Sequence, residues 1–135
     1  MRVAAGYSAA MAWLEARTGC VLTRNARAIQ AVDGAGRIRG VVAYDGWTES
    51  SAQAHMAVDA PVVWRHLVRP AFRYPFVETG REVLLGIIPA DNARSCALAR
   101  RFGFREAYRV VGGWAKGVDL VVHEMRRGEC RWLEE

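Results

Sequence analysis

Residues 87–104, IIPADNARSCALARRFGF, are the stretch of the chain that most clearly indicates a fold. Its first residues belong to an apolar run over residues 83–88, which predicts a strand that begins at residue 82. Asp91 then offers a side chain of the kind that caps helix N-termini, and Gly103 offers a left-handed helix stop. Small and apolar side chains recur between them at helical spacing. We therefore predict a helix over residues 92–102, followed directly by another strand.

The length and composition of the chain indicate one domain over residues 1–135. A chain of 135 residues is long enough to bury a core without help from disulfides or metals. Its three cysteines, Cys20, Cys96 and Cys130, lie far apart and lack zinc-ligand spacing, so we expect free thiols and no metal. No run approaches the roughly 18 apolar residues of a membrane helix, and no leader peptide is recognisable. We expect a cytoplasmic protein without a membrane segment.

The pattern before residue 60 predicts one helix and three strands. The helix covers residues 7–17, with Ser8 as its cap and Gly19 just beyond its end. The strands cover residues 26–32, 38–44 and 52–58. Asp33-Gly34 separates the first two strands and is a β-hairpin signal.

A second helix is predicted to begin at Pro61, since proline suits the first turn. Pro70 and Pro75 lie further along and remove backbone donors, so we expect this helix to be short, bent or split between residues 69 and 74. The last two strands are predicted over residues 104–111 and 118–125, with a loop beginning at Gly112-Gly113.

Asn92, Ser95 and the Gly103-Phe104 pair, whose glycine follows the asparagine by eleven residues, resemble motif B of the GNAT superfamily of acyl-CoA-dependent N-acyltransferases. Residues 40–43 and 119–125 resemble two of its strands. The resemblance implies a GNAT-like α+β fold, a mixed and mostly antiparallel central sheet flanked by helices. The ribosomal-protein-alanine acetyltransferase-like branch, and its small phage or prophage members, are most similar.

The resemblance implies acetyl-CoA as cosubstrate, held where two strands of the sheet splay apart. In this chain those strands would be residues 52–58 and 83–88. Backbone groups of Met56, Ala57 and Val58 would then pair with the pantetheine arm. The N-terminus of the next helix would face the pyrophosphate.

The chain departs from the family pattern at the phosphate loop. Family members have a glycine-rich loop here, whereas residues 62–67 read VVWRHL. Coenzyme A would then be held by Trp64, Arg65, His66 and Leu67, with Asn92 and Ser95 nearby. Alternatively, the Trp64 ring blocks the pocket. Ala99 also stands where many members carry a catalytic tyrosine.

An amine that attacks a thioester must lose a proton, so a base is required. The candidates are His55, because histidine side chains titrate in the useful range, and Glu49 in the loop before it. The amide of Ala57 or of a neighbour would stabilise the oxyanion.

Three functions follow as alternatives. The first is an N-acetyltransferase that moves an acetyl group from acetyl-CoA to a primary amine by direct attack in a ternary complex. The second is a non-catalytic acyl-CoA-binding or protein-interaction module, favoured by the missing glycines and tyrosine. The third is a nucleic-acid partner, favoured by the net charge of +5, although no DNA-binding motif is present. The apolar tail over residues 125–133 would suit docking on a second subunit, so a homodimer is also an expectation.

Overall fold

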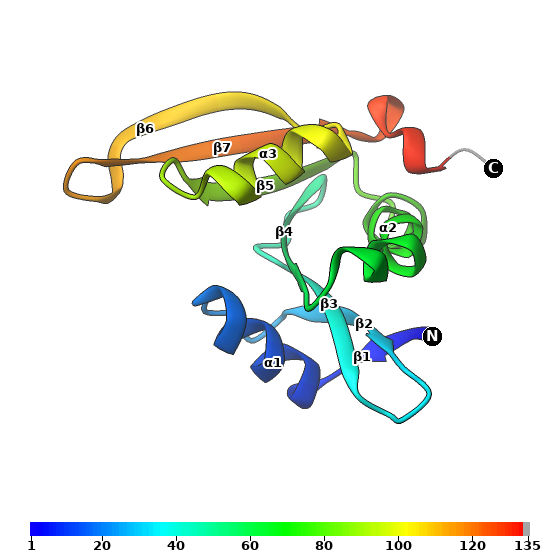
Figure 1. Ribbon diagram of the computed structural model, residues 1–135. Coiled ribbons are helices and arrows are strands. Elements are labelled where there is room, and N and C mark those ends of the chain that lie inside the picture. The colour runs from blue at the N-terminus through cyan, green and yellow to red at the C-terminus, as the bar shows by residue number, and fades with distance from the viewer. Residues whose placement is uncertain (134–135) are drawn as a thin grey trace.

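The computed structural model of the protein describes residues 1–133 and contains one seven-stranded sheet flanked by helices (Figure 1). Its strands are β1 (Arg2–Gly6), β2 (Arg27–Val32), β3 (Ile38–Asp45), β4 (Ser51–Val58), β5 (Val83–Pro89), β6 (Arg105–Ala115) and β7 (Val118–Arg126). Its α-helices are α1 (Ser8–Thr18), α2 (Trp64–Arg73) and α3 (Ala93–Phe102). Short helical turns cover Pro61–Val63, Tyr74–Glu78, Arg127–Glu129 and Arg131–Leu133.

The sheet has the order β1-β2-β3-β4-β5-β7-β6, and only one of its neighbouring pairs is parallel. That pair is β4 with β5, whose paired residues run from Ser51 with Val83 to Gln53 with Leu85. The predicted mixed, mostly antiparallel α+β fold is therefore confirmed.

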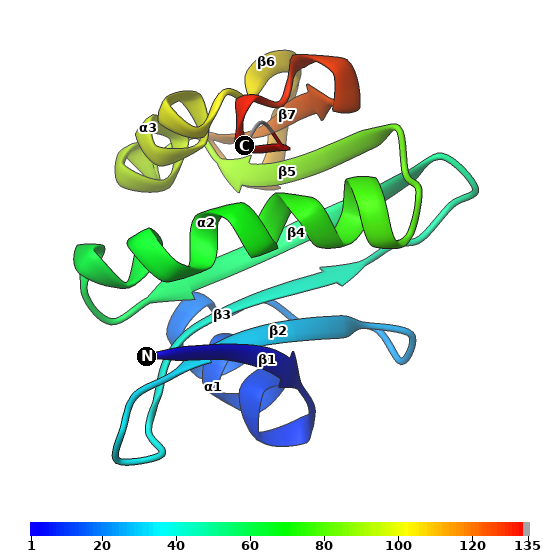
Figure 2. The same cartoon turned by 90° about the vertical axis from the view of Figure 1, so that its right-hand side faces the viewer.

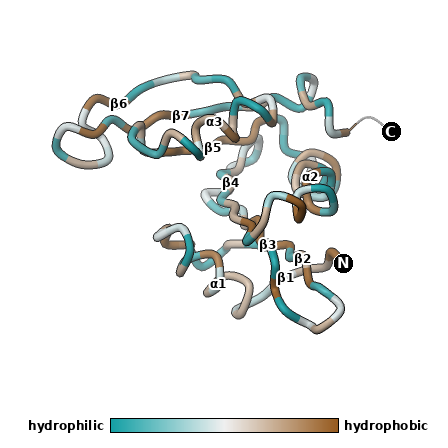
Figure 3. The backbone as a smooth tube through the Cα atoms, viewed as in Figure 1, coloured by the Kyte–Doolittle hydropathy of each residue, from teal (hydrophilic) through white to brown (hydrophobic). Residues whose placement is uncertain are grey.

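The two faces of the sheet carry different helices, as the side view shows (Figure 2). Ala10 and Leu14 of α1 are buried in one cluster together with Val41 and Ala43 of β3. A larger cluster on the opposite face holds α2 and the end of α3. Its fully buried members include Tyr44, Leu67, Phe72 and Leu84. Figure 3 shows β5 as a hydrophobic strand and the loop between β2 and β3 as hydrophilic.

Strand β1 is missing from the sequence prediction. The segment is short and rich in alanine, so its own propensity gives no strand signal. Pairing decides its structure, because Arg2 to Gly6 align antiparallel with Val32 to Ala28 of β2. The helix that follows and the hairpin between β2 and β3 agree with prediction, including the left-handed stop at Gly19. The predicted cap is wrong, because Tyr7 holds the N-cap position without a side-chain hydrogen bond, and Ser8 is the first helical residue.

The second helix was predicted to be short, bent or split between residues 69 and 74, and the structure shows no split at Pro70. The helix continues through Pro70 to Arg73, and a π-helical turn then takes up Pro75. Burial of Leu67 and Phe72 holds the segment on the sheet. The Tyr44 hydroxyl also donates a 2.5 Å hydrogen bond to the carbonyl of Ala71. Core packing therefore outweighs the backbone donor lost at the proline.

Strand β6 corrects the loop predicted at Gly112-Gly113, because the strand runs through both glycines to Ala115. The register of β6 against β7 shifts between Val110 and Ala115, which marks an irregularity that the glycines occupy. Gly112 has a φ of 64°, and a Cβ on Gly113 would lie 2.7 Å from Val110.

The C-terminal tail corrects the expectation of an exposed apolar segment. The Trp132 indole N–H donates to the carbonyl of Phe102 at 2.8 Å, and its ring stacks on Phe72 with centroids 6.4 Å apart. Cys130 is buried, and Leu133 is partly buried against the same core. The apolar side chains of the tail therefore pack on the core of their own chain.

Candidate functional site

The separation of β4 from β5 is the main feature of the site. The two strands pair only as far as Gln53 and Leu85. Beyond that point β4 is paired with β3 alone, up to Gly40 opposite Val58. Within the described residues 1–133, residues 54–58 therefore have one strand edge without a partner strand, at the position where the family resemblance implied a gap. Backbone groups along such an edge can pair with an extended ligand.

Side chains of β4 point alternately to the two faces of the sheet. Met56 and Val58 pack against the cluster beneath α2, whereas Ala57 packs against the cluster beneath α1. His55 shares the α1 face with Ala57. The three predicted backbone partners of the pantetheine thus lie together on the unpaired edge.

His55 contacts a carboxylate that sequence reasoning missed. Its Nε2 lies 2.7 Å from Oδ1 of Asp45, and the other carboxylate oxygen accepts the backbone N–H of Thr23 at 3.2 Å. Asp45 is 4% exposed. In the sequence it appears only as part of an Asp-Gly turn. One signal in the sequence could have revealed this contact. If the strands predicted over residues 38–44 and 52–58 pair antiparallel, the side chains of Asp45 and His55 lie on the same face of the sheet.

Glu49, the other predicted base, lies apart from this pair. It is exposed in the loop that joins β3 to β4. That loop enters β4 at Ser51, where β4 and β5 are still paired, whereas His55 lies two residues beyond the last pair. The structure therefore does not bring the two candidate bases together.

The start of α2 holds the four residues predicted to replace the glycine-rich loop. Arg65 and His66 are exposed, while Leu67 is fully buried. The Trp64 ring meets Phe102 of α3 edge-on, with centroids 4.8 Å apart. The indole thus links the beginning of α2 to the end of α3. Of the four side chains, those of Arg65 and His66 are exposed and can face a soluble anion.

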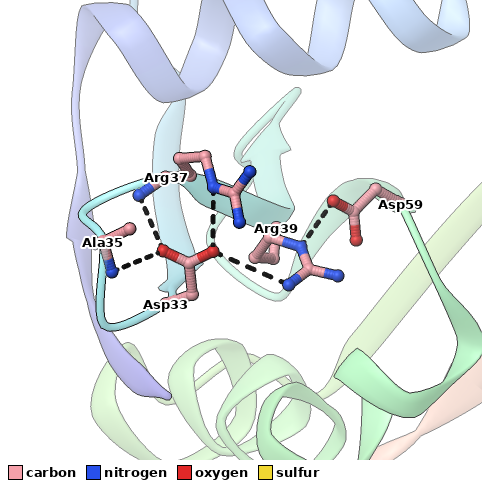
Figure 4. Close-up of polar contacts among 5 residues, drawn as sticks. All are labelled: Asp33, Ala35, Arg37, Arg39 and Asp59. Carbon is pink, nitrogen blue, oxygen red and sulfur yellow. Dashed lines mark hydrogen bonds and ion pairs between the residues drawn. The ribbon is translucent and has the colours of Figure 1, made fainter.

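Ion pairs between arginine and aspartate side chains hold the loop that leads into α2 (Figure 4). Asp59, directly after β4, accepts from Nε of Arg39 at 2.6 Å. Arg39 also lies 3.7 Å from the Asp33 carboxylate, which Arg37 contacts at 3.2 Å. The Asp59 carboxylate raises the pKa of Arg39. Two arginines thus balance two aspartates, and the β2–β3 hairpin holds the entrance to α2.

Asn92 and Ser95 meet at the N-terminus of α3. The Asn92 side chain accepts the backbone N–H of Ser95 at 3.1 Å and so caps the helix. Both residues follow the end of β5, on the side where β5 has already separated from β4. Ala99, which replaces the family's tyrosine, is buried in the core and brings no hydroxyl group.

His123 of β7 is a second residue that the sequence did not single out. It is 1% exposed, and its Nδ1 is buried without a hydrogen-bond partner among residues 1–133. It pairs with Gly86, the first residue of β5 beyond the contact with β4. A Cβ on Gly86 would lie 3.9 Å from that of His123. An imidazole whose Nδ1 has no hydrogen-bond partner among residues 1–133 is therefore buried next to the point where the strands separate.

Two negative findings concern the described residues. Within residues 1–133, no three His, Cys, Asp or Glu side chains gather closely enough to hold a metal ion. In the same range no helix has the length and apolar character needed to cross a membrane.

Comparison with known proteins identifies the fold. No protein-family model and no curated protein sequence matches the chain. Among solved structures, a mutant of spermidine N-acetyltransferase SpeG from Vibrio cholerae aligns over 99% of this chain and 98% of its own, with a TM-score of 0.77 and 13% identity.

Two further structures of the same Vibrio cholerae enzyme agree. One, in complex with manganese ions, has a TM-score of 0.74 at 13% identity and covers 93% of this chain and 91% of its own. Another, in complex with CoA and spermine, has a TM-score of 0.67 at 17% identity and covers 78% of this chain and 68% of its own. The sheet order, the single parallel pair and these similarities together establish that this chain has the fold of the GNAT N-acetyltransferases.

Proposed function

We propose that the protein is an acetyl-CoA-dependent N-acetyltransferase that transfers the acetyl group directly to a primary amine within a ternary complex. The observation that carries this proposal is the unpaired edge of β4 beyond Gln53, opposite the diverging β5. A structure of the same fold was obtained with CoA and spermine, a polyamine, which supports both the cosubstrate and the amine class of acceptor.

Acetyl-CoA would bind along the unpaired edge. Its pantetheine amides pair with backbone groups between Met56 and Val58, as an added strand would. The pyrophosphate lies near the start of α2, where the helix N-terminus and the exposed Arg65 and His66 supply positive potential. The capped end of α3, with Asn92 and Ser95, borders the same space. No metal takes part.

In the transfer step His55 is the base. It accepts a proton from the amine as the nitrogen attacks the thioester carbonyl carbon and the C–N bond forms. A backbone amide of β4, that of Ala57 or a neighbour, donates to the oxyanion. The C–S bond then breaks, and the CoA thiolate leaves with the electron pair and takes a proton from solvent. We place Glu49 outside this step.

The finer assignments are also proposals. The motif over residues 92–104 supports the ribosomal-protein-alanine acetyltransferase-like branch and a phage-type member. Free cysteines at positions 20, 96 and 130 suit a reducing compartment such as the cytoplasm. Self-association would use a surface other than the C-terminal tail.

A non-catalytic acyl-CoA-binding or interaction module is the second candidate. It is favoured by the Trp64 ring, which packs on Phe102 where the family keeps a glycine-rich loop. Ala99 in place of the tyrosine favours it as well.

A transfer assay separates the two candidates. The purified chain is incubated with radiolabelled acetyl-CoA and a panel of amines, namely polyamines, N-terminal peptides and lysine peptides. We expect label in at least one amine, and a loss of about 100-fold or more in kcat for His55→Gln. The matched control is Glu49→Gln, at the residue that we place outside the transfer step, with kcat followed at saturating acetyl-CoA. Binding of acetyl-CoA without transfer to any amine would favour the module.

A further inference from the structure

We infer that Asp45 is a positioning residue that fixes the tautomer of His55, so that Nδ1 is the atom that takes the proton from the amine. The inference rests on the proposed function and deepens it by naming the group that prepares the base. Asp45 acts through His55 and is not assigned a contact with either substrate.

The register of the sheet places the two residues together. Asp45 pairs with Gln53 and Ala43 pairs with His55, so the carboxylate lies diagonally opposite the imidazole on the face that α1 covers. Both come from regular strands, which hold side chains more rigidly than loops do. The pair is therefore built into the scaffold at the point where β4 leaves β5.

The surroundings of Asp45 favour a fixed orientation. Its side chain is 6% exposed and that of His55 is 21% exposed. The carboxylate is held from two sides, by His55 on one oxygen and by the N–H of Thr23 on the other. Because an ionised carboxylate accepts hydrogen bonds and cannot donate them, the Nε2 that faces Asp45 carries the proton.

The chemical consequence concerns the second ring nitrogen. A neutral imidazole protonated on Nε2 keeps its lone pair on Nδ1, and that atom can accept a proton. When it does so, the adjacent carboxylate stabilises the imidazolium that forms. The proton moves from the amine nitrogen to Nδ1 while the C–N bond forms, and no oxidant or metal is needed.

A gain in stability does not by itself explain why Asp45 and His55 lie together. A hydrogen bond between two protein groups contributes little net stability, because it replaces bonds that both groups make to water in the unfolded chain. The pair also lies one or two residues from Met56 and Ala57, whose backbone groups would hold the thioester. Since His55 is on the α1 face and α2 covers the other, the amine would approach from the α1 side and the nucleotide from the α2 side.

The first test needs no substitution. The chain has three histidines, so uniformly ¹⁵N-labelled protein gives three sets of imidazole resonances, which His55→Gln and His66→Gln assign. In mildly alkaline buffer we expect His55 to have a protonated Nε2 and an unprotonated Nδ1. The exposed His66 should show rapid exchange between tautomers. A proton on Nδ1 of His55 in that buffer would overturn the inference, whether or not any transferase activity is found.

The second test is a double-mutant cycle on the active enzyme with Asp45→Asn, His55→Gln and the double variant. We expect Asp45→Asn to lower kcat about tenfold or more while leaving the KM for acetyl-CoA within about twofold. In the His55→Gln background the same change should cost nothing further, since Asp45 acts through the imidazole. The matched control is Asp119→Asn, a carboxylate that bonds the backbone of Gly112 in the distant hairpin.

Two results of the cycle would contradict the inference. One is an additive loss, with Asp45→Asn still lowering kcat in the absence of His55. The other is an unchanged kcat in the folded Asp45→Asn variant. Circular dichroism and acetyl-CoA binding check that each variant is folded. If the wild-type chain transfers no acetyl group at all, the proposed function fails, and the tautomer measurement still decides the role of Asp45 on His55.

Discussion

Buried polar atoms without a hydrogen-bond partner are rare in folded proteins, and the described part of this molecule contains such atoms. His123 is the clearest case, because its Nδ1 has no hydrogen bond among the described residues and the side chain is almost fully buried. Such a group costs stability, since it gives up its bonds to water and gains none.

Replacing this imidazole should therefore stabilise the fold. We expect His123→Leu to raise the free energy of unfolding by about 1 kcal/mol, because leucine has a similar size and no polar atom to satisfy. Urea denaturation measures the change, and the exposed His66→Leu serves as the control. A clear loss of stability would mean that Nδ1 does have a partner in solution, such as a buried water.

Asp33 gives a prediction about pH. The backbone N–H of Arg37, ahead of that of Ala35, holds the pKa of the Asp33 carboxyl below its ordinary value of 3.8. A carboxyl whose pKa is lower in the folded state than in the unfolded state stabilises the fold at pH values above the ordinary pKa. This stabilisation disappears as the pH falls through the lowered pKa. We expect Asp33→Asn to melt at a lower temperature than wild type at neutral pH.

This difference between the two melting temperatures should shrink in strongly acidic buffer, where the wild-type carboxyl is also neutral. Thermal unfolding followed by circular dichroism over a pH series would show it. A difference that stays constant across the series would rule out the charge of Asp33 as its cause.

At the scale of elements, close contact between β3 and the start of α2 fixes the position of the proposed cosubstrate site. Gly40 of β3 makes this contact possible. A Cβ there would lie 2.9 Å from Val58 and 3.0 Å from both Leu67 and Val63. These neighbours belong to the end of β4 and to the helical segment that follows it.

Adding one methyl group at this point should push the elements apart. We expect Gly40→Ala to lower the free energy of unfolding by about 1–3 kcal/mol, the usual range for overpacking a filled core. Chemical denaturation provides the measurement, with Gly34→Ala as the control because nothing lies within 4 Å of a Cβ there. Equal stability of the two variants would show that α2 can shift without cost.

The elements also show where prediction from sequence succeeded. Residues 91–103 combine a residue type that caps helices, helical spacing and a terminal glycine, and each signal is local, so α3 was predicted to within one residue, although Asn92 and not the expected Asp91 caps it. Strand β1 and the path of α2 through Pro70 depend on partners far away in the sequence. Local propensity carries no information about such partners, and here it pointed the wrong way.

At the scale of the whole molecule, the site depends on contacts that are even less visible in the sequence. The resemblance to a family indicated the gap between residues 52–58 and 83–88, whereas composition and spacing alone did not. His55 was singled out as a titratable residue on a strand, but its partner Asp45 emerged only from the register of β3 against β4. Sequence alone could supply the candidate base and not the arrangement around it.

The central claim is that the unpaired edge of β4 binds acetyl-CoA, and isothermal titration tests it most directly. We predict binding of one acetyl-CoA per chain in the micromolar range. Gly86→Val should weaken it at least about tenfold, which is about 1.4 kcal/mol, by filling the point where the strands separate. A Cβ there makes only ordinary contacts at 3.9 Å, and circular dichroism checks that the valine variant is folded. No binding by the wild-type chain at millimolar acetyl-CoA, or equal affinity in the variant, would contradict the account.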